Sequence, residues 1–478
     1  MRNFQGSPAA QPGRPFWALS HDAKAVALVC GAPRVVVSYG ELAGLVERFA
    51  ERVIEQSGPR ALGFIAARND ISSVVGYLGA IRAGHPLALL PAALSAGQLA
   101  NLLERYRPDW LLLPTGQEVP AAYSAQAGEG GVLCRRQMPD PGPLHSELAL
   151  LLSTSGSTGS PKMVRLSAAA VAANAQAIAD YLAIGPDERA ITTLPISYAY
   201  GLSVLNSHLH AGATVLLTDE PVLGRPFWDF CRDLQATSLA GVSYTYQMLR
   251  RLRLDRMDLP ALRTLTQAGG ALDAATKAEF LQMAEARDWR FFCMYGQTEA
   301  VARIAYVPAE CLSGKLDAIG IAIPGGALSL APETGELIYS GPNVMMGYAE
   351  GRADLARGDD LGGVLHTGDL ASVDADGYFS LYGRLKRIAK VFGHRLNLDE
   401  IERGLEIAFP AIRFAVVDGG DRLLVAAHGP LDPTAVAAVL RTSLGLHPTG
   451  FHLIQVDALP MTHNDKTDYR ALAAIMGA

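Results

Sequence analysis

The sequence has few of the features that direct a protein to nucleic acid or to a membrane. Charged residues make up 18% of its 478 residues and the formal net charge is −6, so it has no basic excess for binding nucleic acid. No apolar run approaches the ~18 residues that a membrane span requires. The N-terminus, Met-Arg-Asn-Phe-Gln-Gly-Ser-Pro, lacks an apolar signal segment. We therefore expect a cytoplasmic protein with no membrane span and no nucleic-acid partner.

Cysteine is also scarce. The five cysteines are odd in number, far apart and never form a Cys-x-x-Cys pair. This spacing argues against disulfides and zinc sites, and it favours buried, reduced thiols. The cysteines are Cys30, Cys134, Cys231, Cys293 and Cys311.

A further absence is the Walker A loop, although a loop rich in glycine and hydroxyl groups is present. An apolar run over residues 148–152 stops at eight consecutive hydroxyl or glycine residues, and Lys162 follows shortly after them. Ser160 and Pro161 separate the last glycine of this run from Lys162, whereas a Walker A loop has Gly-Lys in direct succession. Residues 163–166 also look like a strand, not like the helix that a Walker A loop opens.

This loop has the composition of an anion cradle. Glycines allow backbone N–H groups to approach an anion, hydroxyls add donors, and a lysine adds a positive charge, so we expect a nucleotide polyphosphate as the anion. The alternative is a flexible linker, which the strand-like runs on both sides disfavour. The cradle residues are Ser153, Thr154, Ser155, Gly156, Ser157, Thr158, Gly159 and Lys162.

The first 310 residues alternate between strand-like and helix-like segments. Ser38 and Glu41 have the spacing of a capping box and precede an amphipathic helix, and Ser167 can cap an Ala-rich helix that ends near Leu182. This alternation predicts a parallel α/β sheet. Residues 114–145 show little periodicity, and we expect them to form a surface crossover. Further strands are expected at 61–66, 86–91 and 110–113, and further helices at 71–83 and 98–106.

The pattern changes twice towards the C-terminus. Residues 319–382 have short strand-like runs cut by Gly and Pro, which predicts a β-rich region. After Gly383 a small α+β unit is expected, with helices at 398–408 and 434–444 and strands at 414–418, 423–428 and 451–457. We place the domain boundary at about Lys386, which gives domains 1–385 and 386–478.

Four further stretches carry side chains suited to nucleotide chemistry. Tyr295-Gly-Gln-Thr-Glu299 offers an aromatic face for a base, a hydroxyl and a carboxylate for Mg²⁺. In His366-Thr-Gly-Asp369, the aspartate can accept hydrogen bonds from two ribose hydroxyls. The other two stretches are Gly383 to Gly393, which is basic, and Pro460 to Lys466, which ends in a lysine. Each alone could equally be a core tyrosine, a solvated turn or a surface lysine.

Together and in this order, these motifs resemble the adenylate-forming superfamily. That family contains acyl- and aryl-CoA synthetases, the adenylation domains of nonribosomal peptide synthetases, and firefly luciferase, and the sequence is most similar to acyl-CoA ligases. The resemblance covers nearly the whole chain. It implies an α/β fold, in which a large N-terminal domain has two α/β subdomains and a β-rich part, followed by a small, mobile α+β lid.

The resemblance also implies a role for each motif residue. The enzymes of this family join a carboxylate to the α-phosphate of ATP with Mg²⁺, release pyrophosphate, and transfer the acyl group to a thiol. It implies that Lys466 is the catalytic cation that bridges the carboxylate and the α-phosphate, although Asn464-Asp stands where the family usually has Gly before its lysine. The other implied roles are the cradle and Lys162 on the β- and γ-phosphates, Thr298 on the α-phosphate, Glu299 on Mg²⁺, Tyr295 with Gly296 at adenine, Asp369 and Arg384 at the ribose, Lys386 as the hinge, and Gly393 at the thiol tunnel.

The same resemblance predicts the pocket for the acid. In amino-acid adenylation domains an aspartate pairs the substrate ammonium, but Ala199 occupies that position here, so an α-amino acid is disfavoured. Tyr198 stands where many CoA ligases carry a gating histidine. We expect a small to medium carboxylic acid, aliphatic or aryl. The predicted pocket residues are Tyr198, Ala199, Tyr200, Tyr244, Gln267, Gly269 and Gly270, with residues 242–246 as one wall.

Three functions remain open from the sequence. The first is an acyl-CoA synthetase that uses coenzyme A as the acyl acceptor. The second makes the same acyl-adenylate and loads the phosphopantetheine of an acyl carrier protein, and the chain has no carrier domain of its own. The third is a noncatalytic nucleotide-binding protein of this fold, which the joint presence of Glu299, Asp369 and Lys466 disfavours. Light-emitting chemistry of the luciferase type is a remote fourth, because a fold does not confer a reaction.

Overall fold

A computed structural model of the chain divides into two compact units. The first comprises Met1–Ala327 and Tyr339–Leu365, and the second comprises Leu328–Ile338 and His366–Ala478. The structure describes residues 15–31, 34–128, 131–139, 142–153, 162–391, 394–420, 422–444, 447–462 and 467–477. This division falls before the boundary expected at Lys386, and the position of a pivot at that residue stays a prediction.

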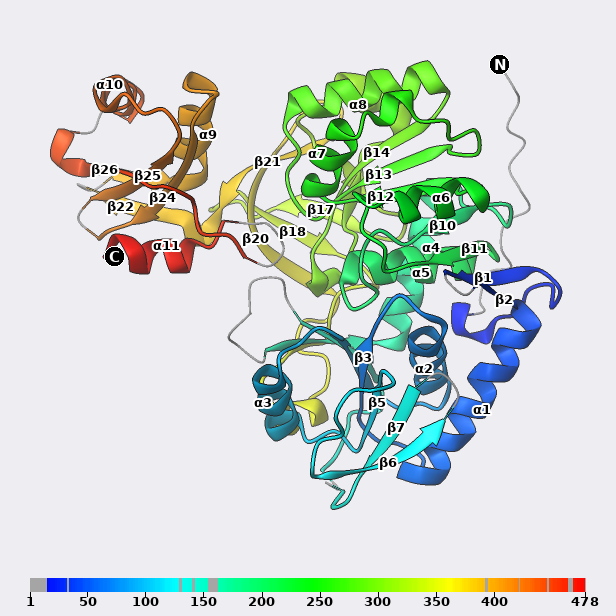
Figure 1. The fold of residues 1–478 in the computed structure, drawn as a ribbon. Coiled ribbons are helices and arrows are strands. Elements are labelled where there is room, and N and C mark those ends of the chain that lie inside the picture. The colour runs from blue at the N-terminus through cyan, green and yellow to red at the C-terminus, as the bar shows by residue number, and fades with distance from the viewer. Residues whose placement is uncertain are drawn as a thin grey trace. The chain divides into compact units, whose positions relative to one another are not determined.

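The first unit contains a nine-stranded sheet whose centre is parallel (Figure 1). Six central strands run parallel to their neighbours, and antiparallel strands close the sheet at both edges. Since parallel strands end at one edge, the loops after β12, β13 and β14 lie together there, where α/β proteins usually bind ligands. In spatial order the strands are β16 (Ile321–Ala322), β15 (Ala305–Tyr306), β14 (Arg290–Tyr295), β13 (Thr264–Gln267), β12 (Ser238–Gly241), β10 (Arg189–Ile191), β11 (Thr214–Leu217), β1 (Val26–Cys30) and β2 (Val35–Ser38).

A second sheet of eight strands belongs to the same unit. Its four central strands are parallel, and the antiparallel pairs β8–β9 and β9–β19 bring residues near 165 and 348 side by side. In spatial order the strands are β19 (Gly347–Ala349), β9 (Met163–Ser167), β8 (Leu148–Ser153), β4 (Leu87–Pro91), β3 (Gly63–Ala67), β5 (Trp110–Leu113), β7 (Gly131–Arg136) and β6 (Tyr123–Gly128).

Strands β6 and β7 correct one expectation. Residues 114–145 were expected to form a surface crossover, but β7 pairs antiparallel with β5 and β6 pairs with β7, so this segment extends the sheet. The alternating apolar and polar pattern of a half-buried strand is weak here because β6, Tyr-Ser-Ala-Gln-Ala-Gly, consists largely of small side chains.

Helices cover the sheets of the first unit, and their starts follow local signals. Ser38 and Glu41 form the expected capping box of α1, and Ser167 caps α4, which ends at Leu182 as predicted. Helix α1 packs on α2, and α4 packs on α5. The helices are α1 (Tyr39–Ser57), α2 (Ile71–Arg82), α3 (Ala96–Tyr106), α4 (Ala168–Leu182), α5 (Ala199–His210), α6 (Arg225–Asp233), α7 (Ser243–Arg251) and α8 (Ala274–Arg287).

In its described residues, the second unit contains three small sheets and three α-helices. One apolar core joins α9 and α10 to β24 and β25, and α11 covers the opposite face of the same sheet through Leu472. The sheets are β17 (Ala327–Leu330), β18 (Glu336–Ser340), β20 (Val364–Val373) and β21 (Phe379–Arg384); β22 (Ile388–Val391) and β23 (His394–Asn397); and β24 (Arg413–Asp418), β25 (Leu423–His428) and β26 (Phe451–Gln455). The helices are α9 (Leu398–Ala408), α10 (Pro433–Leu444) and α11 (Tyr469–Met476).

Candidate active site

The phosphate-loop hairpin is the first element of the site. Strands β8 and β9 pair antiparallel, and the pairing of Ser153 with Met163 closes the hairpin next to the loop. Residues 154–161, which include the cradle from Thr154 to Gly159, lie outside the described residues. Lys162 is half-buried at the foot of β9, and its Nζ lies 3.5 Å from the centroid of the Tyr348 ring. The lysine charge is therefore held over an aromatic face.

Glu299 contacts Tyr348 from a segment that follows a strand of the other sheet. It lies in a short 3-10 helix, Thr298–Ala300, which follows strand β14. The Tyr348 O–H donates to Glu299 Oε1 at 2.8 Å. Burial raises the pKa of Tyr348, and the carboxylate of Glu299 raises it further, so the tyrosine stays a donor. Lys162, Tyr348 and Glu299 thus form one array that the chain assembles from three distant segments.

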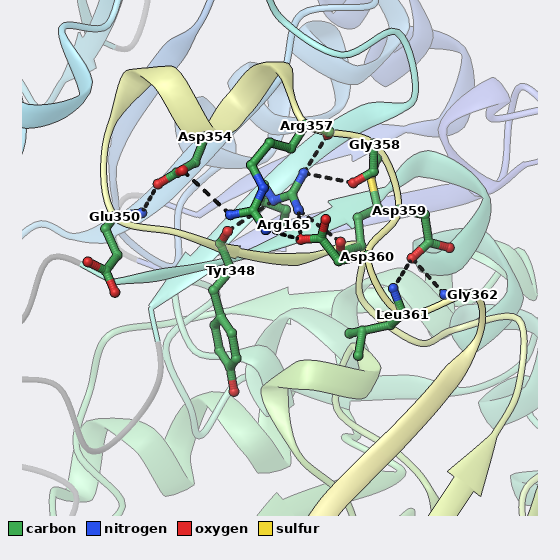
Figure 2. A network of polar contacts seen from close by, with 11 residues as sticks. Arg165, Tyr348, Glu350, Asp354, Arg357, Gly358, Asp359, Asp360, Leu361 and Gly362 are labelled. Carbon is green, nitrogen blue, oxygen red and sulfur yellow. Dashed lines mark hydrogen bonds and ion pairs between the residues drawn. The ribbon is translucent and has the colours of Figure 1, made fainter.

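Tyr348 is a site residue that sequence reasoning missed. It lies on β19, opposite Val164 of β9, and a lone Gly-Tyr pair in a β-rich stretch gave no signal for its role. Its strand is fixed by Arg165, which is fully buried and donates to Asp360 Oδ2 at 2.6 Å (Figure 2). Gly347 makes this approach possible, because its φ is +121° and a Cβ there would lie 2.3 Å from the Asp360 carboxylate.

The loop after β14 folds back tightly on itself. Gly296 has no room for a side chain, since a Cβ would lie 1.7 Å from the Ala302 carbonyl oxygen. Val301 and Ala302 have φ of +59° and +129°, which is strained backbone for residues other than glycine. The side chain of Gln297 donates to the hydroxyl of Tyr295 at 3.0 Å. The predicted adenine and phosphate motif, Tyr295 to Glu299, is therefore held in one compact turn at the end of β14.

The predicted pocket residues fall into two groups. Ala199 and Tyr200 are buried at the start of α5, and the Tyr200 O–H donates to the Thr266 carbonyl at 2.9 Å. A Cβ on Gly269 would lie 2.7 Å from the Tyr198 hydroxyl, so the absence of a side chain there makes room for this tyrosine. Burial raises the pKa of Tyr198. These residues come together at the edge where β12 and β13 end.

The remaining predicted pocket residues lie in a turn, at the surface or in the core. Gln267 is buried, and its amide donates to the Gly270 carbonyl at 2.7 Å, which fixes the turn after β13. Tyr244 is 44% exposed. Tyr246 is fully buried against the rings of Phe280 and Phe291, so it belongs to the core and not to a pocket wall.

The predicted ribose site lies in the second unit. Asp369 on β20 pairs with Arg384 on β21, and the Arg384 Nε lies 3.0 Å from Asp369 Oδ1. Asp369 is buried whereas the Arg384 side chain is 63% exposed. Lys386 lies in the 3-10 turn that follows, Leu385–Arg387. Gly393 and Lys466 lie outside the described residues.

The described residues hold few candidates for a metal ion. No group of three or more His, Cys, Asp or Glu side chains gathers in the described ranges. Glu299 fits Mg²⁺ nevertheless, because this ion commonly takes one or two carboxylates together with phosphate oxygens of the substrate and water. One of the two Glu299 oxygens accepts the Tyr348 hydrogen bond, which orients the carboxylate.

The fold and this arrangement define a class of nucleotide-using enzymes, and comparison with known proteins identifies it. The family model described as "AMP-binding enzyme" matches residues 16–349, which is most of the chain. The chain therefore belongs to the AMP-binding enzyme family, and the resemblance to adenylate-forming enzymes is confirmed.

Individual relatives come from both branches of this family. The chain is 29% identical to a linear gramicidin synthase of Brevibacillus parabrevis over 92% of its length, but it spans only 6% of that protein. It is 30% identical to feruloyl-CoA synthase of an Amycolatopsis species, covering 67% of this chain and 68% of the relative.

A solved structure shows the same fold. O-succinylbenzoate coenzyme A synthetase (MenE) of Bacillus subtilis, in complex with AMP, superposes with a TM-score of 0.76 at 21% identity, covering 96% of this chain and 98% of that one. The expected α/β fold class is thereby confirmed. In the parts of the chain that the structure describes, no helix combines the length and apolar character needed to cross a membrane.

Proposed function

We propose that the chain activates a carboxylic acid with ATP to give an acyl-adenylate and pyrophosphate, and then transfers the acyl group to coenzyme A. The observation that carries this proposal is the array of Lys162, Tyr348 and Glu299. It places a cation and an oriented carboxylate beside the hairpin that carries the glycine- and hydroxyl-rich loop. Such a set suits a polyphosphate, which needs charge neutralisation and in-line alignment.

Each motif residue has a part in this reaction. The loop 153–159 and Lys162 hold the β- and γ-phosphates and then the leaving pyrophosphate. Mg²⁺ bound at Glu299 would neutralise phosphate charge. Thr298 contacts the α-phosphate and Tyr295 stacks on adenine. Asp369 accepts from the ribose hydroxyls while Arg384, already paired with it, steadies the carboxylate.

Lys466 is the proposed cation for the transition state. A carboxylate and an α-phosphate repel each other, so a lysine that bridges them lowers the barrier most where charge builds up between them. We further propose that the C-terminal part turns about Lys386 after adenylation. This motion would remove Lys466 and bring the loop of Gly393 to the site for entry of the thiol arm.

The acyl acceptor separates two versions of this function. Feruloyl-CoA synthase, a relative by sequence, supports coenzyme A. Linear gramicidin synthase, the other relative, supports a phosphopantetheine carrier as the alternative. Both acceptors present the same thiol arm, so one site can serve either.

Exchange of labelled pyrophosphate into ATP tests the first half-reaction. Short, long, aryl and dicarboxylic acids are offered in turn, and at least one should support exchange that depends on both the acid and Mg²⁺. No exchange over the whole panel would instead favour a binding protein of the same fold. Coenzyme A and a carrier protein are then offered separately with the active acid; loading of the carrier alone would assign the alternative acceptor.

A further inference from the structure

Three arginines in the described residues are buried: Arg165, Arg303 and Arg352 are 0%, 2% and 4% exposed. Two of them have carboxylate partners. Arg165 pairs with Asp360 at 2.6 Å (Figure 2), and Arg352 pairs with Asp109 at 3.0 Å. This is the usual condition of a buried charge, because an unpaired charge away from water is strongly unfavourable.

Arg303 differs from the other two. Its Nε donates to the sulfur of Met294 at 3.4 Å, its Nη1 donates to the carbonyl of Ala302 at 3.3 Å, and its guanidinium lies 4.0 Å from the centroid of the Tyr200 ring. These acceptors are neutral, and a thioether sulfur is a weak hydrogen-bond acceptor. In the part of the chain that the structure describes, no carboxylate pairs with Arg303. The planar, five-donor group therefore lacks the anion it is shaped to bind.

The backbone is strained to put Arg303 in this position. The two residues before it, Val301 and Ala302, both have positive φ, and this is costly for a β-branched valine. Two buried amides hold its main chain: Asn343 Nδ2 donates to the Arg303 carbonyl at 2.9 Å, and Asn174 Nδ2 donates to it at 3.3 Å. Strain that is held in place this firmly commonly marks a functional position.

The guanidinium lies at the predicted acid pocket. Burial raises the pKa of Tyr198 and Tyr200, and the positive charge of Arg303 opposes that rise at both phenols. Arg303 also lines an internal cavity of about 20 Å³ together with Ser203, Thr266 and Glu188. The Glu188 carboxylate is already paired with Arg263 and Arg290, at 3.4 and 3.8 Å. That volume suits about one water molecule, which would hydrate the guanidinium when no substrate is present.

We propose that Arg303 binds a second carboxylate of the substrate, so that the acid activated by this chain is a dicarboxylic acid. This inference rests on the proposed adenylation function and narrows its substrate class. One carboxylate reacts at the α-phosphate, and the other forms a two-pronged ion pair with Arg303 against the Tyr200 ring.

The test compares each dicarboxylic acid with its half-amide, in which a neutral group of the same shape replaces the second carboxylate. Succinate, glutarate and an aryl dicarboxylate are suitable probes in the pyrophosphate-exchange assay. The intact chain should prefer the diacid over its half-amide by about 100-fold in kcat/KM, the range expected of a charged hydrogen-bonded pair. Arg303→Met should abolish this preference and retain exchange with the half-amide, and Arg303→Lys should keep part of it.

Stability measurements separate a binding role from a structural one. Arg303→Met removes a charge that has no described carboxylate partner, so its unfolding temperature should be unchanged or raised. The matched control, Arg352→Met, strands the buried Asp109 and should lower the unfolding temperature. A diacid alone should raise the unfolding temperature of the intact chain but not that of Arg303→Met.

Three results would overturn the inference. A preference of the intact chain for the half-amides would exclude a second carboxylate. An equal loss with diacid and half-amide in Arg303→Met would mean that Arg303 orients the reacting carboxylate. Exchange with monocarboxylic acids only would refute the dicarboxylic substrate and still support the proposed adenylation function. No exchange with any acid would refute both.

Discussion

Replacing Tyr348 with phenylalanine isolates a single hydrogen bond at the site. The substitution removes the hydroxyl that donates to Glu299 Oε1 at 2.8 Å and leaves the ring under Lys162 in place. A hydrogen bond to a charged group contributes about 1.5–3 kcal/mol. Because both residues are only half-buried, we take the lower end, about 1.5 kcal/mol, which corresponds to roughly a tenfold effect.

Tyr348→Leu is the matched second variant, since it also removes the aromatic face. The Lys162 Nζ lies 3.5 Å from the ring centroid, and a partly desolvated contact of this kind contributes about 1 kcal/mol. The two losses together come to about 2.5 kcal/mol, or roughly 70-fold. The two variants therefore separate the part of the carboxylate from the part of the lysine.

The assay is pyrophosphate exchange as a function of Mg²⁺ and of ATP. We expect Tyr348→Phe to raise the Mg²⁺ concentration for half-maximal exchange about tenfold with little change at saturating Mg²⁺, because the unsupported carboxylate binds the ion less well. Tyr348→Leu should in addition raise the KM for ATP. If Tyr348→Phe leaves the Mg²⁺ dependence unchanged, Glu299 does not act through this hydrogen bond and the assignment of the array is wrong.

Three further predictions concern the supports of the site and the second unit. Gly347→Ala would bring a Cβ within 2.3 Å of the Asp360 carboxylate at a φ of +121°, so chemical denaturation should show a loss of about 3 kcal/mol. Arg387→Met leaves the Glu402 carboxylate, which is only 13% exposed, without its 2.6 Å partner. Unfolding of the second unit should be easier by about 3 kcal/mol at pH 8, and adding Glu402→Gln should restore most of that loss. Lys466→Ala should abolish pyrophosphate exchange while largely sparing thioester formation from added acyl-adenylate, and equal loss of both steps would refute domain alternation.

Much of the fold could be predicted because its signals are local. Helix α4 begins after Ser167 and ends at Leu182 as expected, and α9 spans Leu398–Ala408, since capping side chains and helical periodicity act within a few residues. Hairpin β6–β7 was missed because its strands are defined by pairing with β5, and small or polar side chains on a sheet edge leave no alternation to read.

The same contrast between local signals and long-range contacts applies to the candidate site. Glu299 and Lys162 could be found because they sit inside motifs whose composition suits phosphate and metal. Tyr348 could not, because its role depends on β19 pairing with β9 and on the Arg165–Asp360 ion pair, whose members are 195 residues apart in sequence. Residues that support a site through long-range packing carry no local pattern, and only the folded chain identifies them.

The three buried arginines show what the fold adds to a motif. In sequence, Arg165, Arg303 and Arg352 are equivalent, and composition gives no reason to prefer one as a binding residue. In the folded chain, Asp360 and Asp109 neutralise the charges of Arg165 and Arg352, so neither arginine needs a ligand to compensate its burial. Arg303 instead contacts the neutral groups of Met294 and Ala302. It lies at the end of a strained loop that also carries Glu299. An anionic ligand would neutralise its buried charge. The same loop thus couples recognition of the acid to the carboxylate proposed to hold the metal, and substitutions at Gly296 should disturb both together, because any side chain there collides with the Ala302 carbonyl.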